Sequence, residues 1–241
     1  MTKNPDEQRI FKYKYKDIIM NKMKIEIWSD IMCPFCYIGK RRFEKSLENT
    51  ALKDKVDIEW KSFQLNPDLQ TDTSIRIDDY LAQHKGMPLA QAQSLNAQVT
   101  QMAAQEGLVY NFDKSIVANS FKAHVLTHFA KQFGKQDEVE ELLFQSYFTE
   151  GKNIDDIEVL KDIAERLAID ANSFEKAVVE GSIEDEVKMD MHEARQIGVQ
   201  GVPFFVYDRK YAVSGAQPLE LFEQTLQQAV EEWQEGASSA N

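Results

Sequence analysis

Two cysteines, Cys33 and Cys36, are the residues whose type and spacing most directly indicate chemistry in this chain. They are its only cysteines, and Pro34 and Phe35 separate them. Two thiols at this spacing can close an intramolecular disulfide, and a thiolate can reopen a disulfide by attacking one of its sulfurs. The pair therefore predicts a redox-active dithiol, in which one thiol attacks and the other resolves the mixed disulfide.

The surrounding sequence predicts that a strand leads directly to Cys33 and that a helix follows it. Residues 24–28 contain the apolar, β-prone side chains of Ile25, Ile27 and Trp28, and residues 34–48 are compatible with a helix. Pro34 suits the first helical position, because it has no N–H to leave unpaired and its φ is already set. Cys33 is then the N-cap, where free amides and the helix dipole favour a thiolate. We therefore predict Cys33 as the nucleophile and Cys36, one turn into the helix, as the resolving thiol.

This stretch resembles the active site of the thioredoxin superfamily, and most closely that of the FrnE-like branch of the DsbA oxidoreductases. The resemblance recurs at 119–124, 147–151 and 198–218, so it covers nearly all of residues 23–233. It implies an α/β protein, a thioredoxin fold with a large all-helical insertion of the DsbA type. It also implies that the protein is a protein disulfide oxidoreductase.

The resemblance assigns a second site segment, far along the chain, to Val202 and Pro203. This dipeptide is similar to the cis-proline loop that faces the CxxC pair in the superfamily, and X–Pro bonds adopt cis far more readily than others. On the family's pattern, the backbone of Val202 pairs with the substrate, and Pro34, Phe35 and Pro203 also contact it. The residues alone also allow Pro203 to start an edge strand.

The hydrophobic pattern divides the chain into a split thioredoxin domain around a helical segment. Alternation favours a strand at 56–65, and strands are also expected at 204–207 and 211–214, on either side of a turn at 208–210. From residue 74 to about 197 the period is helical and predicts roughly six or seven helices. The expected segments are an extension with little order (1–22), the two parts of the thioredoxin domain (23–73 and 198–235), the helical insertion (74–197) and a tail (236–241).

Composition and net charge limit the classes of partner and the cellular compartment that we expect for this protein. The formal net charge of −12 argues against nucleic acid, which requires a basic surface. No apolar run reaches the length of a membrane span, and residues 1–22 lack the apolar core of a secretory signal. We expect a cytoplasmic protein, and in that reducing compartment a two-cysteine disulfide is more often catalytic than structural. The expected substrate is a protein or small molecule that contains a thiol or a disulfide.

Charged residues near the thiols are expected to contribute little to their reactivity. The residues between the cysteines are uncharged, and the basic run 40–42 begins about two helical turns from Cys33. Ile27 stands where thioredoxin and periplasmic DsbA carry a buried acid that shuttles protons. Asp30 and Glu26 are the acids that could replace it, and neither is assigned that role.

One alternative from the residue types is a structural zinc site in an adaptor protein. Cys33 and Cys36 could supply one pair of ligands, and His124 and His128, one helical turn apart, could supply the other. The two pairs are separated by far more residues than in a zinc finger. Histidines at this helical spacing are common by chance, so we favour the redox interpretation and predict no metal.

A second alternative keeps the fold and changes the reaction. The same resemblance extends to kappa-class glutathione transferases and hydroxychromene-carboxylate isomerases, which bind glutathione in this groove. Their activating residue is typically Ser where this chain has Cys33. Cys36 has no use in glutathione transfer, whereas dithiol exchange requires it. We therefore predict no cofactor beyond the redox-active disulfide, with glutathione as a candidate co-substrate or mixed-disulfide partner.

Overall fold

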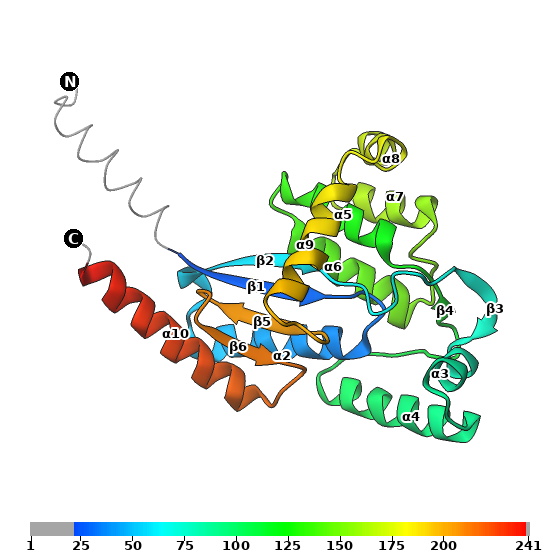
Figure 1. Cartoon of the computed structure of the whole chain (residues 1–241), viewed down its shortest axis with the longest axis horizontal. Helices are drawn as coiled ribbons and strands as arrows, with labels where there is room; N and C mark the ends of the chain where they lie inside the picture. Colours follow the sequence, from blue (N-terminus) through cyan, green and yellow to red (C-terminus); the bar gives the residue numbers. More distant parts are fainter. Residues whose placement is uncertain (1–21, 240–241) are drawn as a thin grey trace.

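The computed structural model describes residues 22–239 as a twisted sheet with helices on both faces and a larger helical part at one end (Figure 1). The expected extension, residues 1–22, lies outside this range except for Lys22. The elements in chain order are β1 (Met23–Ser29), α2 (Pro34–Thr50), η1 (Lys53–Lys55), β2 (Val56–Ser62), β3 (Asp72–Arg76), α3 (Ile77–Lys85), α4 (Leu89–Gln105), β4 (Ile116–Val117), α5 (Phe121–Lys131), α6 (Gln136–Phe144), the π-helical turn η2 (Gln145–Thr149), α7 (Ile157–Arg166), α8 (Ala171–Glu180), α9 (Glu184–Gln196), β5 (Phe204–Tyr207), β6 (Tyr211–Ser214) and α10 (Leu219–Ser239).

The central sheet has four strands in the order β2-β1-β5-β6. β1 and β2 are parallel, whereas β5 is antiparallel to both β1 and β6. Parallel neighbours require a crossover connection, and α2 provides it between β1 and β2. The predicted strands are confirmed, although β2 ends at Ser62 where the sequence indicated a strand as far as residue 65.

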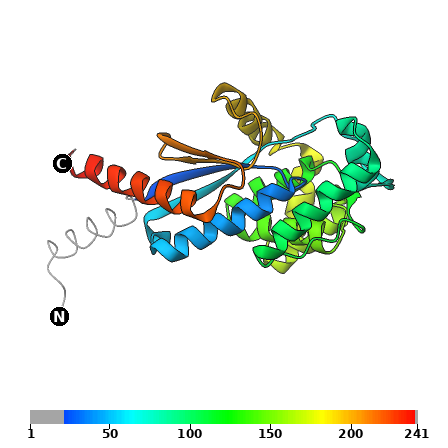
Figure 2. The ribbon, with the colours of Figure 1, turned by 90° about the horizontal axis from the view of Figure 1, so that it is seen from below.

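The central strand β1 sends alternate side chains into two different cores. Ile25 and Ile27 are fully buried in the core formed with α2 and α10. Trp28 points the other way, into a smaller core beneath α9. Figure 2 shows the sheet between these two layers. Both faces of β1 are covered, so the strand that leads to Cys33 is anchored from either side.

The segment between β2 and β5 is confirmed as a helical insertion, with seven α-helices, α3 to α9, in the described part of the chain. It is not all helical, however, because β3 and β4 form a two-stranded antiparallel sheet. The sequence missed this sheet because β3 is polar and largely exposed and β4 has only two residues. Neither strand shows the alternation of a half-buried strand.

The final helix is longer than expected. Residues 236–239, predicted as part of a tail, continue α10 as far as Ser239, and residues 240–241 lie outside the described range. One glycine at the exposed end of a long helix costs only about 1 kcal/mol relative to alanine. Gly236 therefore does not end the helix. Within residues 22–239, no helix is long and apolar enough to cross a membrane.

A buried cation ties α2 to the insertion. Lys40 is 1% exposed, and its Nζ lies 3.1 Å from Glu141 and 3.4 Å from Asp137 on α6, and pairs with Glu44 on its own helix. Arg41 binds the same two glutamates. Burial opposes the charge of Lys40, but the surrounding carboxylates outweigh it and raise the pKa of the ammonium. These ion pairs fix the position of the insertion relative to the helix that carries the cysteines.

Candidate active site

Cys33 occupies the N-cap of α2, as the sequence predicts, with an extended backbone (φ −85°, ψ 111°) and Pro34 as the first helical residue. The turn before it is closed by Cys33 N–H, which donates to the Asp30 carbonyl at 2.9 Å. Cys36 N–H in turn donates to the Cys33 carbonyl at 3.0 Å. Cys33 and Cys36 are both free cysteines in this structure.

The structure brings Val202 and Pro203 to the thiols, as the resemblance implied. The Sγ of Cys33 donates to the Val202 carbonyl at 3.4 Å, across 169 residues of sequence, and the Val202–Pro203 bond is cis. Gly39 makes this approach possible, because a Cβ there would lie 2.8 Å from Pro203 Cγ and 3.4 Å from the Phe205 ring. Any side chain at residue 39 would push α2 away from this loop.

The two thiols have different surroundings. Cys36 is 1% exposed, and burial raises the pKa of its thiol well above the ordinary value. The hydrogen bond with Cys33 and the charge that Cys33 can carry raise it further. Cys33 is 4% exposed but lines a pocket, whereas Cys36 does not. This asymmetry fits a division into one thiol that meets the substrate and one that resolves it.

The first turn of α2 rests on an aromatic cluster from the insertion. The hydroxyl of Tyr110 donates to the Pro34 carbonyl at 2.7 Å, and its ring stacks on Phe148 with centroids 4.6 Å apart. Burial raises the pKa of Tyr110, so this hydroxyl remains a donor at neutral pH. Sequence reasoning missed Tyr110, because nothing in its own segment indicates a partner 76 residues away.

The two nearby acids have structural contacts. Asp30 is 1% exposed, and its carboxylate accepts the N–H groups of Met32 at 3.2 Å and Leu65 at 2.8 Å. His124 lies with Nε2 3.7 Å from Asp30 Oδ1. Glu26 lies on the strand that leads to the site and binds Arg209. Asp30 therefore holds the loop before Cys33 against the segment after β2.

The four residues of the zinc alternative do not come together. His124 faces Asp30, whereas His128 binds Asp190 at 2.9 Å and Ser62 at 3.1 Å. No group of three or more His, Cys, Asp or Glu side chains suited to a metal occurs within residues 22–239. The two histidines instead join α5 to the loop at Asp30 and to β2 and α9, respectively.

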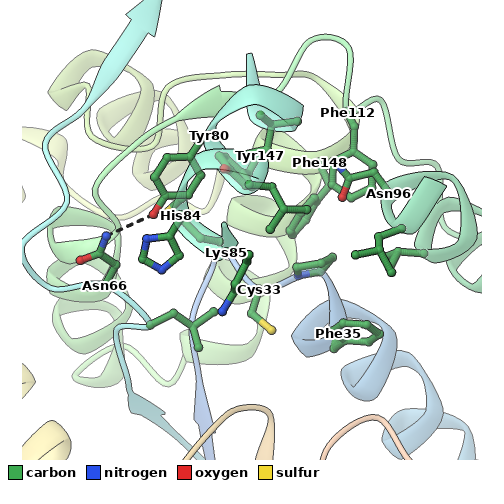
Figure 3. Close-up of a pocket in the computed structure, with 17 residues that line it drawn as sticks. Cys33, Phe35, Asn66, Tyr80, His84, Lys85, Asn96, Phe112, Tyr147 and Phe148 are labelled. Carbon is green, nitrogen blue, oxygen red and sulfur yellow. Dashed lines mark hydrogen bonds between the residues drawn. The ribbon is translucent and has the colours of Figure 1, made fainter. Parts of the chain in front are cut away.

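A pocket of about 350 Å³ opens directly beside Cys33 (Figure 3). It is lined by the loop and first turn at residues 32–35, the segment after β2, helices α3 and α4, and aromatic residues of the insertion. Phe35 is 39% exposed and Leu65 is 52% exposed, and both line it. Sequence reasoning missed the pocket because its walls come from segments far apart in the chain.

Comparison with known proteins identifies the family. The model of the DsbA-like thioredoxin domain matches residues 24–227. A probable DsbA oxidoreductase of Streptomyces coelicolor has a similar structure, with a TM-score of 0.82 and 37% identity, covering 87% of this chain and 91% of its own.

Other known proteins are similar in sequence or in fold. YwbO of Bacillus subtilis is 28% identical over 84% of this chain and 94% of its own. The cytosolic disulfide reductase DsbM of Pseudomonas aeruginosa covers 86% of this chain and 98% of its own at a TM-score of 0.62, but with only 14% identity. A 2-hydroxychromene-2-carboxylate isomerase covers 87% of this chain and 97% of its own, at a TM-score of 0.65 and 18% identity. The match of the family model over most of the chain places this protein in the DsbA-like thioredoxin domain family.

Proposed function

We propose that this protein is a cytoplasmic thiol–disulfide oxidoreductase that works through the Cys33–Cys36 dithiol. The observation that carries the proposal is the placement of Cys33 at the N-terminus of α2, beside an open pocket and 3.4 Å from the Val202 carbonyl. Membership of a family whose solved relatives include disulfide oxidoreductases supports this chemistry.

The proposed cycle has two exchange steps. The Cys33 thiolate attacks one sulfur of a substrate disulfide, which forms a mixed disulfide and expels the other sulfur as a thiolate. Cys36 then loses its proton and attacks Cys33 Sγ, which closes the Cys33–Cys36 disulfide and releases the second substrate thiolate. The substrate disulfide gains the two electrons that the dithiol loses, and the same steps in reverse oxidise a substrate dithiol.

The environment of Cys36 sets the order of these steps. Burial is the main cause that raises the pKa of the Cys36 thiol, and the hydrogen bond and charge of Cys33 add to it. Once Cys33 is held in a mixed disulfide, it can carry no charge. The electrostatic cost of a Cys36 thiolate falls at that moment, so Cys36 becomes reactive when resolution is needed.

The Val202 loop supplies the proposed substrate contact. The Val202 carbonyl accepts a hydrogen bond from the Cys33 thiol at 3.4 Å. When Cys33 enters a mixed disulfide, this bond is lost and the carbonyl becomes free for a donor on the substrate. Pro34 and Phe35 border the same opening and complete the proposed substrate-binding set.

Glutathione is the proposed thiol partner that resets the dithiol. The fold of the cytosolic reductase DsbM, one of whose structures contains GSH, makes it a reasonable partner to test. Glutathione-dependent isomerisation is the second candidate, suggested by the fold of the 2-hydroxychromene-2-carboxylate isomerase. We expect little isomerase turnover, and isomerisation that survives in Cys36→Ser would favour this second candidate instead.

Trapping of mixed disulfides tests the proposal. The variant Cys36→Ser should accumulate covalent adducts through Cys33 when it is mixed with disulfides or with cell extract, because the resolving step is absent. Cys33→Ser is the matched control and should trap nothing. Adducts of equal yield with Cys33→Ser, or none with Cys36→Ser under conditions that oxidise the wild-type protein, would contradict the assigned roles.

A further inference from the structure

We propose that the pocket beside Cys33 binds the aromatic arm of a low-molecular-mass disulfide that carries a carboxylate, and so selects the substrate. This inference deepens the proposed function and rests on it. It follows from the size of the pocket, its aromatic floor, its charge and its position as the way to Cys33.

The volume suits a small molecule. Ligand pockets for drug-sized molecules measure about 300–1,000 Å³ and are mostly apolar. This pocket measures about 350 Å³, and the insertion helices α3 and α4 close one side of it. It has room for one substituted ring next to the sulfur, and it is too small for a folded protein surface.

The floor of the pocket favours a ring. Phe112 and Phe148 meet edge to face with centroids 6.1 Å apart, and Tyr147 packs against Phe148 at 4.9 Å. On the opposite wall, Tyr80 stacks on His84 at 5.4 Å and its hydroxyl is held by Asn66 (Figure 3). Aromatic contacts contribute beyond the area they bury, so a flat aromatic group fits better here than a polar peptide chain.

The charge of the pocket differs from that of the whole protein. The chain has 40 acidic residues, yet none of the 17 residues that line the pocket is Asp or Glu. Asp78 lies outside the lining, where it accepts the Asn96 amide at 2.7 Å. Lys85 lines the pocket, and its side-chain ammonium makes no hydrogen bond or ion pair within residues 22–239. An apolar ligand with one negative group complements this surface.

Access to the nucleophile passes through the same pocket. Cys33 is 4% exposed, and the pocket is the opening that it lines. A sulfur attached to a ring in the pocket would lie next to the Cys33 thiol. The Cys33 thiolate attacks that sulfur, forms a mixed disulfide with the aromatic arm and expels the other arm as a thiolate. Cys36 then closes the protein disulfide and releases the aromatic thiolate, so one reduced protein consumes one disulfide and needs no other reductant.

Binding is tested without exchange chemistry. The reduced protein is titrated by calorimetry with 4-(methylthio)benzoate, a thioether that cannot exchange, and with S-methylglutathione as the polar counterpart. We expect the aromatic thioether to bind at least about tenfold more tightly, since burial of one ring gives about this factor or more. Val99→Trp, which fills the pocket from α4, should remove this preference. Leu95→Trp, at a position 38% exposed on the rim, repeats the test if Val99→Trp does not fold.

Selectivity is tested in single-turnover reduction of 4,4′-dithiodibenzoate and of oxidised glutathione. We expect Val99→Trp to slow the aromatic disulfide at least about tenfold and the glutathione disulfide less than about threefold. Lys85→Gln should slow the dibenzoate about two- to fivefold and leave bis(4-hydroxyphenyl) disulfide unchanged, because an exposed ion pair contributes that much. Lys176→Gln on α8 is the control and should change neither rate.

The outcomes separate the inference from the proposed function. If glutathione disulfide is reduced but the aromatic thioether does not bind, or Val99→Trp slows both disulfides equally, the pocket inference is wrong and the function stands. If a cysteine-containing peptide disulfide reacts faster than every small aromatic disulfide and Val99→Trp slows the peptide, the occupant is a peptide and the inference is wrong. If the thioether binds but no disulfide is reduced, the oxidoreductase function fails, and the substrate role of the pocket fails with it.

Discussion

The N-terminal end of α2 and the segment that follows it use their side chains in opposite ways. The N-cap and the first turns, residues 33–39, carry both cysteines and no charged residue, and they lie beside the pocket and the Val202 loop. The next residues, Lys40 and Arg41, bind carboxylates on α6 and on α2 itself. One helix therefore supplies an uncharged end that carries the cysteines and a charged anchoring segment.

This difference separates reactivity from attachment. The cations near the CxxC pair are satisfied by Glu44, Glu141 and Asp137, so they fix the insertion instead of tuning the thiols. The carboxyl of Glu141 shows the result, because its ion pairs with Arg41 and Lys40 outweigh burial and lower its pKa. We therefore expect substitutions within residues 33–39 to change exchange and substitutions at the anchoring cations to change stability.

The largest effect is expected for Cys33→Ser. A hydroxyl cannot replace the thiolate in disulfide exchange, so this variant should show no measurable reduction of any disulfide. Its free energy of unfolding should change by less than about 1 kcal/mol, because the change is nearly isosteric. The rate of thiol release measures disulfide reduction, and urea denaturation measures the free energy of unfolding. A loss of unfolding free energy well above about 1 kcal/mol in this variant would contradict the separation of reactivity from attachment.

A large stability effect is expected for Lys40→Met. This change leaves the carboxylates around Lys40 without their shared buried cation, and breaking a buried pair costs about 3 kcal/mol. Arg41 and solvent compensate part of the loss, since Glu44 and Glu141 are about 30% exposed. The control is Lys45→Met at an exposed position of the same helix, which should stay within about 0.5 kcal/mol. The rate of disulfide exchange per folded molecule should remain near that of the wild type. A loss of activity with unchanged stability would contradict the anchoring role of Lys40.

A pH-dependent effect is expected for Glu140→Gln. Glu140 lies next to Glu141 in sequence but points into the core, where burial raises its pKa to about 7 and only Thr127 donates to it within the described residues, at 2.9 Å. In the unfolded chain the carboxyl loses its proton near pH 4.5. At this carboxyl the folded state therefore binds more protons between these values, and the contribution of Glu140 to stability falls as the pH rises from about 4.5 to 7.

The variant removes this titration. Glu140→Gln should match the wild type near pH 4.5 and exceed it by about 1–3 kcal/mol at pH 8, because an amide does not have to lose a proton. Urea denaturation at stepped pH measures the difference, with Glu138→Gln at an exposed position of α6 as control. A difference between Glu140→Gln and the wild type that stays constant with pH would contradict the assignment.

A small stability effect is expected for Phe35→Ala. Phe35 lies on the pocket rim at 39% exposure, so its truncation should cost less than about 1 kcal/mol. Phe43, on the same helix but 1% exposed, gives the matched comparison, and Phe43→Ala should cost about 3–5 kcal/mol. Thermal denaturation ranks the two variants. Equal losses would show that the reactive end of α2 also contributes to the core.

Local patterns in the sequence predicted much of this molecule. The alternation at β2 and the helix start at Pro34 are short-range signals, and the structure has a strand and a helix there. The position of Val202 beside Cys33 required the family resemblance, because no local pattern indicates a contact across 169 residues.

Other features depend on tertiary contacts that no single segment reveals. Lys40 reads as a surface lysine in sequence and becomes a buried cation only because α6 places Asp137 and Glu141 around it. The pocket is lined by residues of separate segments, among them Phe35, Leu65 and Lys85. Such features could not be predicted, since they arise from packing and not from periodicity.

A redox titration tests the central claim most directly. The native protein is equilibrated against glutathione buffers of stepped ratio, and its free thiols are trapped and counted by mass. We expect one two-electron transition between a dithiol and an intramolecular disulfide, with a midpoint of roughly −150 to −250 mV, because the helix dipole stabilises the reduced form and no charged residue between the cysteines adds to it. Two free thiols at every potential, or glutathione adducts that never give way to an internal disulfide, would contradict the account.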